Sequence, residues 1–226
     1  MKEEPATEIS MERWKFFHAG GLILTGSMVV LREDILPVLL FMSLSMGYYI
    51  LKQHHFLKTF HPYGGYANLV TLLRIVTVLL TGLKSSTLHP YLILLVLIMV
   101  LIFDGVDGYL ARKYNTSSRF GQVFDLETDN FFTLILCSIL YLNGYVPWWI
   151  ILSGLLSYGY VMADYLLDWS TKKVPANRHA RVLSVIVFST YFTPFVFPYM
   201  VYFPLVVLGT VLLAFSFGYS VFLRYR

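Results

Sequence analysis

Four aspartates carry the most distinctive chemistry in this sequence. Asp104 and Asp107 stand three residues apart, and Asp125 and Asp129 stand four residues apart. Both separations place side chains on one face of an α-helix. A charge at the centre of a bilayer costs at least about 2.5–3.5 kcal/mol, so carboxylates within apolar segments are candidates for function. A single aspartate could mark a helix end at the lipid headgroups, but two consecutive pairs are harder to explain in that way.

A short polar stretch, residues 113–120, joins the two segments that carry these pairs. The four carboxylates are therefore predicted to face one another, and close anions repel strongly in a medium of low dielectric constant. Protonation or bound cations would relieve this repulsion. Mg²⁺ and Mn²⁺ prefer oxygen ligands, and such ions are often shared with substrate phosphates. The pattern predicts a site for one or two divalent cations that acts on a phosphate-bearing substrate.

Small residues and one arginine extend the same two helix faces. Gly108, Ala111 and Arg112 follow the first aspartate pair, and Gly121 precedes Asp125 by one helical turn. Small residues let two backbones approach closely or leave room for a ligand, while the planar guanidinium of Arg112 suits a phosphate. Tight helix packing alone would explain the glycines but not the aspartates, so a metal–phosphate site is favoured.

The elements that position these residues are predicted to be membrane helices. Hydrophobic residues make up 57% of the 226-residue chain and charged residues only 13%, and the mean hydropathy is +0.66. This charged share is about half that of typical soluble domains, so a soluble fold could not cover itself with polar surface. The single cysteine, Cys137, cannot form an intramolecular disulfide. The abundant Phe and Tyr residues are predicted to face lipid.

A spanning helix needs about 20 mostly apolar residues, and this criterion predicts eight spans. They cover residues 16–31, 35–52, 67–83, 89–110, 121–143, 146–168, 180–197 and 200–223. If both chain ends lie on one side, only Arg32 and Lys84 of the 17 Lys and Arg residues fall on the opposite side. The positive-inside rule then predicts that the termini and the aspartates face the cytoplasm, at the cell membrane if the source is prokaryotic.

The stretch from Asp104 to Asp129 resembles the complete signature of the CDP-alcohol phosphatidyltransferases. The signature positions are filled by Asp104, Asp107, Gly108, Ala111, Arg112, Gly121, Asp125 and Asp129. Eight residues of fixed type at fixed spacing make this resemblance specific. Residues 67–74, which include Asn68, Thr71 and Arg74, also resemble the opening of that family's core.

The resemblance implies an all-α, polytopic membrane protein with a six-helix core. The signature would lie at the end of the second core helix and the start of the third. Residues 61–226 would form the phosphatidyltransferase membrane domain, and residues 1–60 would form an N-terminal extension with two short membrane helices. A homodimer is implied by the family alone.

The resemblance also implies a role for each signature residue. Asp104, Asp107 and Asp125 would bind Mg²⁺ or Mn²⁺, and Asp129 would be a ligand of a second ion and the general base. The nucleotide and diphosphate would be contacted by Gly108, Ala111, Arg112, Ser118 and Gly121 and, from a neighbouring helix, by Asn68 and Thr71. Such an enzyme moves the phosphatidyl group of CDP-diacylglycerol to the hydroxyl of a small alcohol and releases CMP.

The signature does not identify the acceptor alcohol. Leu126-Glu127-Thr128 separates the last two aspartates, where relatives that make phosphatidylglycerophosphate usually have Pro-Leu-Ala. Glu127 lies off the metal face, and we expect a supporting or a surface role for it. A downstream basic stretch could hold an anionic acceptor such as an alcohol phosphate, although ordinary positive charge beside a span is the favoured explanation. Its residues are Lys172, Lys173, Arg178 and Arg181.

Three other functions stay open at this point. The same fold could use CDP-choline or CDP-ethanolamine with diacylglycerol as the acceptor. An intramembrane prenyltransferase also uses two aspartate-rich motifs with Mg²⁺, but its motifs lie much farther apart than Asp107 and Asp125. A cation transporter would have acidic residues near the middle of the membrane and broken or repeated helices. In this sequence the acidic residues cluster at one edge of the spans, and no inverted repeat is evident. Nothing indicates nucleic-acid binding, because the basic residues follow the membrane topology.

Overall fold

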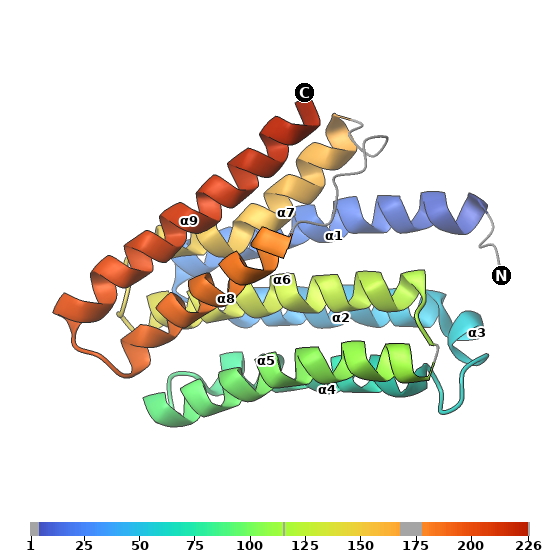
Figure 1. The fold of residues 1–226 in the computed structure, drawn as a ribbon, viewed down its shortest axis with the longest axis horizontal. Coiled ribbons are helices and arrows are strands. Elements are labelled where there is room, and N and C mark those ends of the chain that lie inside the picture. Colours follow the sequence, from blue (N-terminus) through green and yellow to red (C-terminus); the bar gives the residue numbers. More distant parts are fainter. Residues whose placement is uncertain (1–4, 115, 168–177, 226) are drawn as a thin grey trace.

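The structure is a computed structural model that describes residues 5–114, 116–167 and 178–225 (Figure 1). Within these residues every regular element is a helix, which confirms the predicted all-α class. The five longest helices are α1 (Pro5–Arg32), α4 (Gly65–Lys84), α5 (Pro90–Lys113), α6 (Arg119–Leu142) and α9 (Tyr199–Tyr225). The shorter ones are α2 (Leu36–Lys52), α3 (His54–Leu57), α7 (Ile150–Leu166), α8 (Arg178–Phe192) and the 3₁₀ turn η2 (Thr193–Phe195).

Four helices are long and apolar enough to cross a membrane. They contain the segments Met11–Arg32, Gly65–Lys84, Pro90–Lys113 and Tyr199–Phe222. Large apolar side chains such as Leu31, Met200 and Phe215 are more than two-thirds exposed on these helices. Extended apolar surface of this kind is not typical of a soluble monomer. The chain is therefore an integral membrane protein, as its composition predicted.

Each of the eight predicted spans coincides with a helix, but several boundaries differ. Helix α1 begins at Pro5, well before the predicted residue 16, because the helix continues through polar residues that a hydropathy criterion leaves out. Helix α7 begins at Ile150 rather than residue 146, since the N–H groups of Tyr145 and Val146 still donate to the carbonyl oxygen of Leu140 and so belong to the turn that ends α6. Helix α2 has 17 residues, about 25 Å at 1.5 Å per residue. Whether this short helix crosses the bilayer stays a prediction.

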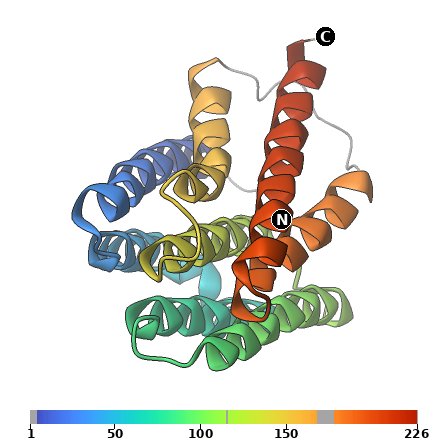
Figure 2. The ribbon, with the colours of Figure 1, turned by 90° about the vertical axis from the view of Figure 1, so that its left-hand side faces the viewer.

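Helix α6 lies at the centre of the molecule. It packs against α4 on one side and α7 on the other, while α5 packs on α4, α1 packs on α7 and α2, and α8 packs on α9 (Figures 1 and 2). Almost every side chain in its second half is buried, from Phe131 to Leu140. The contacts that fix the rotation of α6 about its axis therefore also fix the positions of Asp125 and Asp129 on its first half.

The N-terminal helices pack directly on the rest of the chain. Helix α1 lies against α7, and α2 contacts α4. The division into an extension of residues 1–60 and a domain of residues 61–226 stays a prediction, but these helices are joined to the core by buried side chains such as Leu22, Val38 and Met42.

Candidate active site

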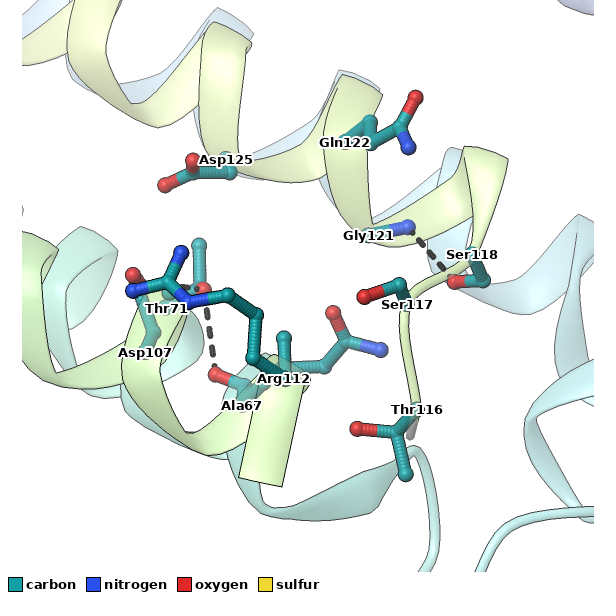
Figure 3. Close-up of a pocket in the computed structure, with 13 residues that line it drawn as sticks. Ala67, Thr71, Asp107, Arg112, Thr116, Ser117, Ser118, Gly121, Gln122 and Asp125 are labelled. Atoms are coloured by element: carbon teal, nitrogen blue, oxygen red, sulfur yellow. Dashed lines mark hydrogen bonds between the residues drawn. The ribbon is translucent and has the colours of Figure 1, made fainter. Parts of the chain in front are cut away.

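Six of the eight signature residues, all but Asp104 and Asp129, line one cavity between α4, α5 and α6 (Figure 3). Its volume is about 180 Å³. The lining residues are Ala67, Asn68, Thr71, Asp107, Gly108, Ala111, Arg112, Thr116, Ser117, Ser118, Gly121, Gln122 and Asp125. All seven residues that were predicted to contact the nucleotide or diphosphate are among them. The structure thus brings these positions together, while their contacts with substrate stay predictions.

Three of the aspartates offer a set of metal ligands. Asp104, Asp107 and Asp125 each present a carboxylate oxygen, and these oxygens lie within 4.8 Å of one another. Asp107 is buried, whereas the side chains of Asp104 and Asp125 are 43% and 41% exposed. Hard divalent cations prefer such an all-oxygen set, so the residues fit the Mg²⁺ or Mn²⁺ that the sequence predicted.

Arg74 of α4 joins all four aspartates, and sequence reasoning missed this role. Its Nη1 donates to Asp107 Oδ2 at 2.8 Å and to Asp125 Oδ1 at 2.7 Å. Its Nη2 lies 3.0 Å from Asp104 Oδ1 and donates to Asp129 Oδ1. The side chain is 1% exposed. A basic residue inside an apolar span usually pairs with another charge, so the position of Arg74 within a predicted span is a sequence signal for this role.

One guanidinium reduces the repulsion between four carboxylates without cancelling their negative charge. Asp129, which follows Asp125 by one helical turn, has a 45% exposed side chain and is tied to the other aspartates through Arg74. Its carboxylate can therefore meet a group that enters from solvent while one of its oxygens accepts a hydrogen bond from Arg74. The arrangement leaves the cluster able to bind further positive charge.

Two predicted substrate contacts on α4 also hold other parts of the site. Thr71 Oγ1 donates to Asp107 Oδ2 at 3.0 Å, and partners of this kind orient metal ligands. Asn68 Nδ2 donates to the carbonyl oxygen of Gly64 at 2.7 Å. Gly64 and Gly65 have positive φ angles of 77° and 80°, which glycine adopts at little cost. This turn starts α4 and so places Asn68 and Thr71 at the cavity.

The start of α6 forms another wall of the cavity. Ser118 is the N-cap of α6, and its Oγ accepts a hydrogen bond from the N–H of Gly121 at 3.0 Å (Figure 3). A helix N-terminus carries free N–H groups and a partial positive charge, which favour a phosphate. Figure 3 also shows Arg112 reaching across the cavity toward Asp107. Both features suit an anionic ligand.

Glu127 lies on the back of α6, away from the aspartates. It is 1% exposed, so the possibility of a surface role is wrong, whereas its place off the metal face is confirmed. Successive residues of a helix turn by about 100°, which puts Glu127 on nearly the opposite side from Asp125. Its Oε2 lies 3.7 Å from His18 Nε2 of α1.

The predicted acceptor contacts cannot be placed. Lys172 and Lys173 lie outside the described residues. Arg178 and Arg181 belong to α8, but their side chains are also outside the described part of the chain. Their role stays a prediction.

The family model for CDP-alcohol phosphatidyltransferase matches residues 65–221, well over half of the chain. The chain therefore belongs to the CDP-alcohol phosphatidyltransferase family, as the resemblance of Asp104 to Asp129 predicted. The matched region begins with α4 and ends within α9, so α1 and α2 lie outside it. Membership speaks against the prenyltransferase and transporter alternatives.

Several named proteins are similar to part of the chain. The CDP-diacylglycerol–inositol 3-phosphatidyltransferase of Candida albicans is 36% identical over 97 residues, which are 42% of this chain and 42% of that protein. A Mycobacterium tuberculosis protein provisionally named a cardiolipin synthase is 31% identical over 116 residues, 50% of this chain and 51% of its own. The CDP-diacylglycerol–glycerol-3-phosphate 3-phosphatidyltransferase of Escherichia coli is 31% identical over 87 residues, 37% of this chain and 47% of its own.

The chain spans about half the length of the curated relatives it matches. Two of their names specify different alcohols, inositol and glycerol 3-phosphate, so similarity does not single out one acceptor. No solved structure matches the chain.

Proposed function

We propose that this chain is a metal-dependent transferase that moves the phosphatidyl group of CDP-diacylglycerol to the hydroxyl of a small alcohol and releases CMP. The observation that carries the proposal is that the four aspartates meet at Arg74, beside a cavity lined by every residue predicted to contact the nucleotide or diphosphate. Two of the similar proteins have CDP-diacylglycerol in their names, which supports this donor.

Asp104, Asp107 and Asp125 would hold the metal, with Asp129 as a ligand of a second ion. When bound, Mg²⁺ or Mn²⁺ would neutralise the diphosphate and stabilise CMP as a leaving group. The N-terminus of α6 and Arg112 would bind the phosphates. In this arrangement α4, α5 and α6 would each contribute to holding the donor.

Asp129 would act as the general base. Its half-exposed carboxylate can accept the proton of the acceptor hydroxyl. The hydroxyl oxygen then attacks the phosphorus next to diacylglycerol, and the bond from that phosphorus to CMP breaks. The hydrogen bond from Arg74 would keep the carboxylate oriented during this step.

We place the site at the cytoplasmic face of the membrane. The basic residues Arg112, Lys113 and Arg119 surround the cavity end of α5 and α6, whereas Arg32 and Lys84 lie at the opposite helix ends. The positive-inside rule supports this orientation. The proposed homodimer rests on the family resemblance.

The test is an assay of the purified chain with labelled CDP-diacylglycerol and Mg²⁺ or Mn²⁺. The acceptor panel contains glycerol 3-phosphate, serine, inositol, inositol phosphate, choline and phosphatidylglycerol. We expect metal-dependent CMP release and a new phospholipid with one of them, and loss of both on adding EDTA. Reaction of CDP-choline or CDP-ethanolamine with diacylglycerol, with no reaction of CDP-diacylglycerol, would overturn the proposed direction.

A further inference from the structure

The back face of α6 is covered by a stack of aromatic rings from three helices. The stack runs from His18 and Trp14 of α1 through Tyr49 of α2 to Phe120 and Phe124 of α6. Consecutive ring centroids lie 4.7, 4.1, 5.1 and 5.4 Å apart, and the interplanar angles are between 12° and 25°. The N-terminal helices, which lie outside the matched family region, therefore reach the helix that carries Asp125 and Asp129.

The stack belongs to the protein interior. All five side chains are at most 7% exposed, so the prediction that the Phe and Tyr residues face lipid is wrong for Tyr49, Phe120 and Phe124. Buried, stacked rings interdigitate closely and tolerate little displacement. A shift of α1 or α2 would therefore be transmitted to the first turns of α6.

Polar contacts connect α1 and α6 beside the same stack. His18 Nε2 and Glu127 Oε2 are 3.7 Å apart, both are buried, and neither has a hydrogen-bond partner among the described residues. The other ring nitrogen of His18 lies 2.7 Å from Ser45 Oγ of α2. Nearer the helix ends, Arg119 Nη2 lies 3.4 Å from Glu12 Oε1. Because unpaired polar groups are costly to bury, a shift that separated α1 from α6 here would remove the nearest polar neighbour that each of these two atoms has on the other helix.

The two faces of α6 are occupied by different partners. Phe120, Phe124 and Glu127 are spaced i, i+4 and i+7 and share the back face, whereas Asp125 and Asp129 share the front face. Arg74 holds the front face. On the back, α7 packs along α6, and the first turns of α6 also contact Tyr49 of α2 and Glu12 and His18 of α1. Rotation or sliding of α6 is thus resisted from both sides.

We infer that α1 and α2 are a positioning part of the active site. The ring stack and the His18–Glu127 contact set where Asp125 and Asp129 stand relative to Asp104 and Asp107 on α5. Trp14, His18 and Tyr49 are positioning residues in this account. The inference rests on the proposed function, in that the four aspartates are taken to bind a divalent cation.

The experiment measures Mn²⁺ affinity, without lipid substrate, by the electron paramagnetic resonance signal of free Mn²⁺. Full-length protein in detergent is compared with Tyr49→Leu, which removes the central ring. Loss of groups that orient metal ligands typically weakens metal binding about 10–100-fold, and we expect at least the lower end of this range. Tyr49→Phe keeps the ring and should bind Mn²⁺ like the wild type.

Met42→Ala is the matched control for instability. Met42 is a fully buried side chain of α2, two turns from Tyr49 and outside the stack. We expect it to lower the Tm without weakening Mn²⁺ binding. Phe120→Leu removes a ring of the stack from the α6 side and should also weaken Mn²⁺ binding. It replaces Tyr49→Leu in the comparison if Tyr49→Leu does not fold.

Unchanged Mn²⁺ affinity in the stack variants, or an equal loss in Met42→Ala, would overturn the inference. A wild-type protein that binds no Mn²⁺ would instead overturn the proposed metal site, and the inference with it. The two failures are distinguishable because the first leaves wild-type binding intact.

Discussion

At the scale of single residues, Arg74 gives the four aspartates a shared partner. The aspartates alone would repel one another, but the guanidinium lies within 3.0 Å of oxygens from Asp104, Asp107 and Asp125 and also donates to Asp129. The planar fork of arginine suits several carboxylates at once. Arg74 therefore assembles the cluster from α4, and the proposed metal ion would enter a site that is already organised.

Replacing Arg74 by Gln should destabilise the protein in the absence of divalent cations. Removing one partner from a fully buried ion pair typically costs about 3–5 kcal/mol. Three of the four carboxylates are 41–45% exposed and water screens exposed pairs, so we expect a loss below this range. Mn²⁺ should restore part of the lost Tm, because a ligand that binds the folded state stabilises it. Thermal unfolding in detergent with EDTA or Mn²⁺ measures both effects. The Tm of Arg74→Lys is expected to lie between those of the wild type and Arg74→Gln. An equal Tm rise on adding Mn²⁺ to wild type and Arg74→Gln would contradict this role.

Replacing Asp129 by Asn should abolish turnover while leaving CDP-diacylglycerol binding largely intact. Asn keeps the size of the side chain but cannot accept the proton of the acceptor, and general-base catalysis typically contributes 10²–10⁴-fold. The measurement is CMP release together with equilibrium binding of labelled CDP-diacylglycerol. Activity near the wild-type level would remove Asp129 as the base.

At the scale of secondary-structure elements, the distance between α4 and α6 shapes the cavity. A Cβ atom on Gly121 would lie 2.9 Å from Asn68 Oδ1 and 3.3 Å from Ser118 Oγ. Asn68 is itself held by its hydrogen bond to Gly64, so it has little freedom to withdraw. Gly121 therefore lets the start of α6 lie close to α4, as the sequence predicted for small residues on these faces.

Gly121→Ala should lower activity by forcing α4 and α6 apart. Overpacking of this kind typically costs about 1–3 kcal/mol, and we expect a weaker apparent affinity for CDP-diacylglycerol together with a lower Tm. Gly105→Ala is the control, because a Cβ atom at Gly105 would meet nothing within 4 Å. Equal rates of CMP release by Gly121→Ala and Gly105→Ala would show that the close approach of α4 and α6 is not needed for activity.

At the scale of the whole molecule, the helices form a membrane protein with its ionisable cluster at one end. The aspartates lie toward the α5–α6 connection, while the turns that contain Lys84 and Glu33 lie at the other end of the helices. Cys137, the only native cysteine, is fully buried. New cysteines at exposed positions can therefore report on each end separately.

Ser86→Cys and Thr59→Cys should label from opposite sides of the membrane. Both positions are exposed, Ser86 after α4 and Thr59 in the connection between α3 and α4. In intact cells, a membrane-impermeant maleimide should react with Ser86→Cys and reach Thr59→Cys only after the membrane is permeabilised. The reverse pattern would place the active site on the outer side.

Much of this protein follows from the sequence alone. The spacing of Asp104, Asp107, Asp125 and Asp129 determines which side chains share a helix face, because helical periodicity is a local property. Hydropathy located the helices to within a few residues in most cases, and the signature identified the family. Helix ends were less well predicted where polar residues continue a helix, as in α1.

The tertiary structure alone decided which distant residues complete the site. Arg74 is separated by 33 to 55 residues from Asp107, Asp125 and Asp129, and Glu12 is separated by 107 residues from Arg119. Such contacts depend on which helix faces pack together, and no local pattern encodes that choice. The sequence therefore determined the chemistry of the aspartates, whereas packing determined that Arg74 joins them and that α1 and α2 support them from behind.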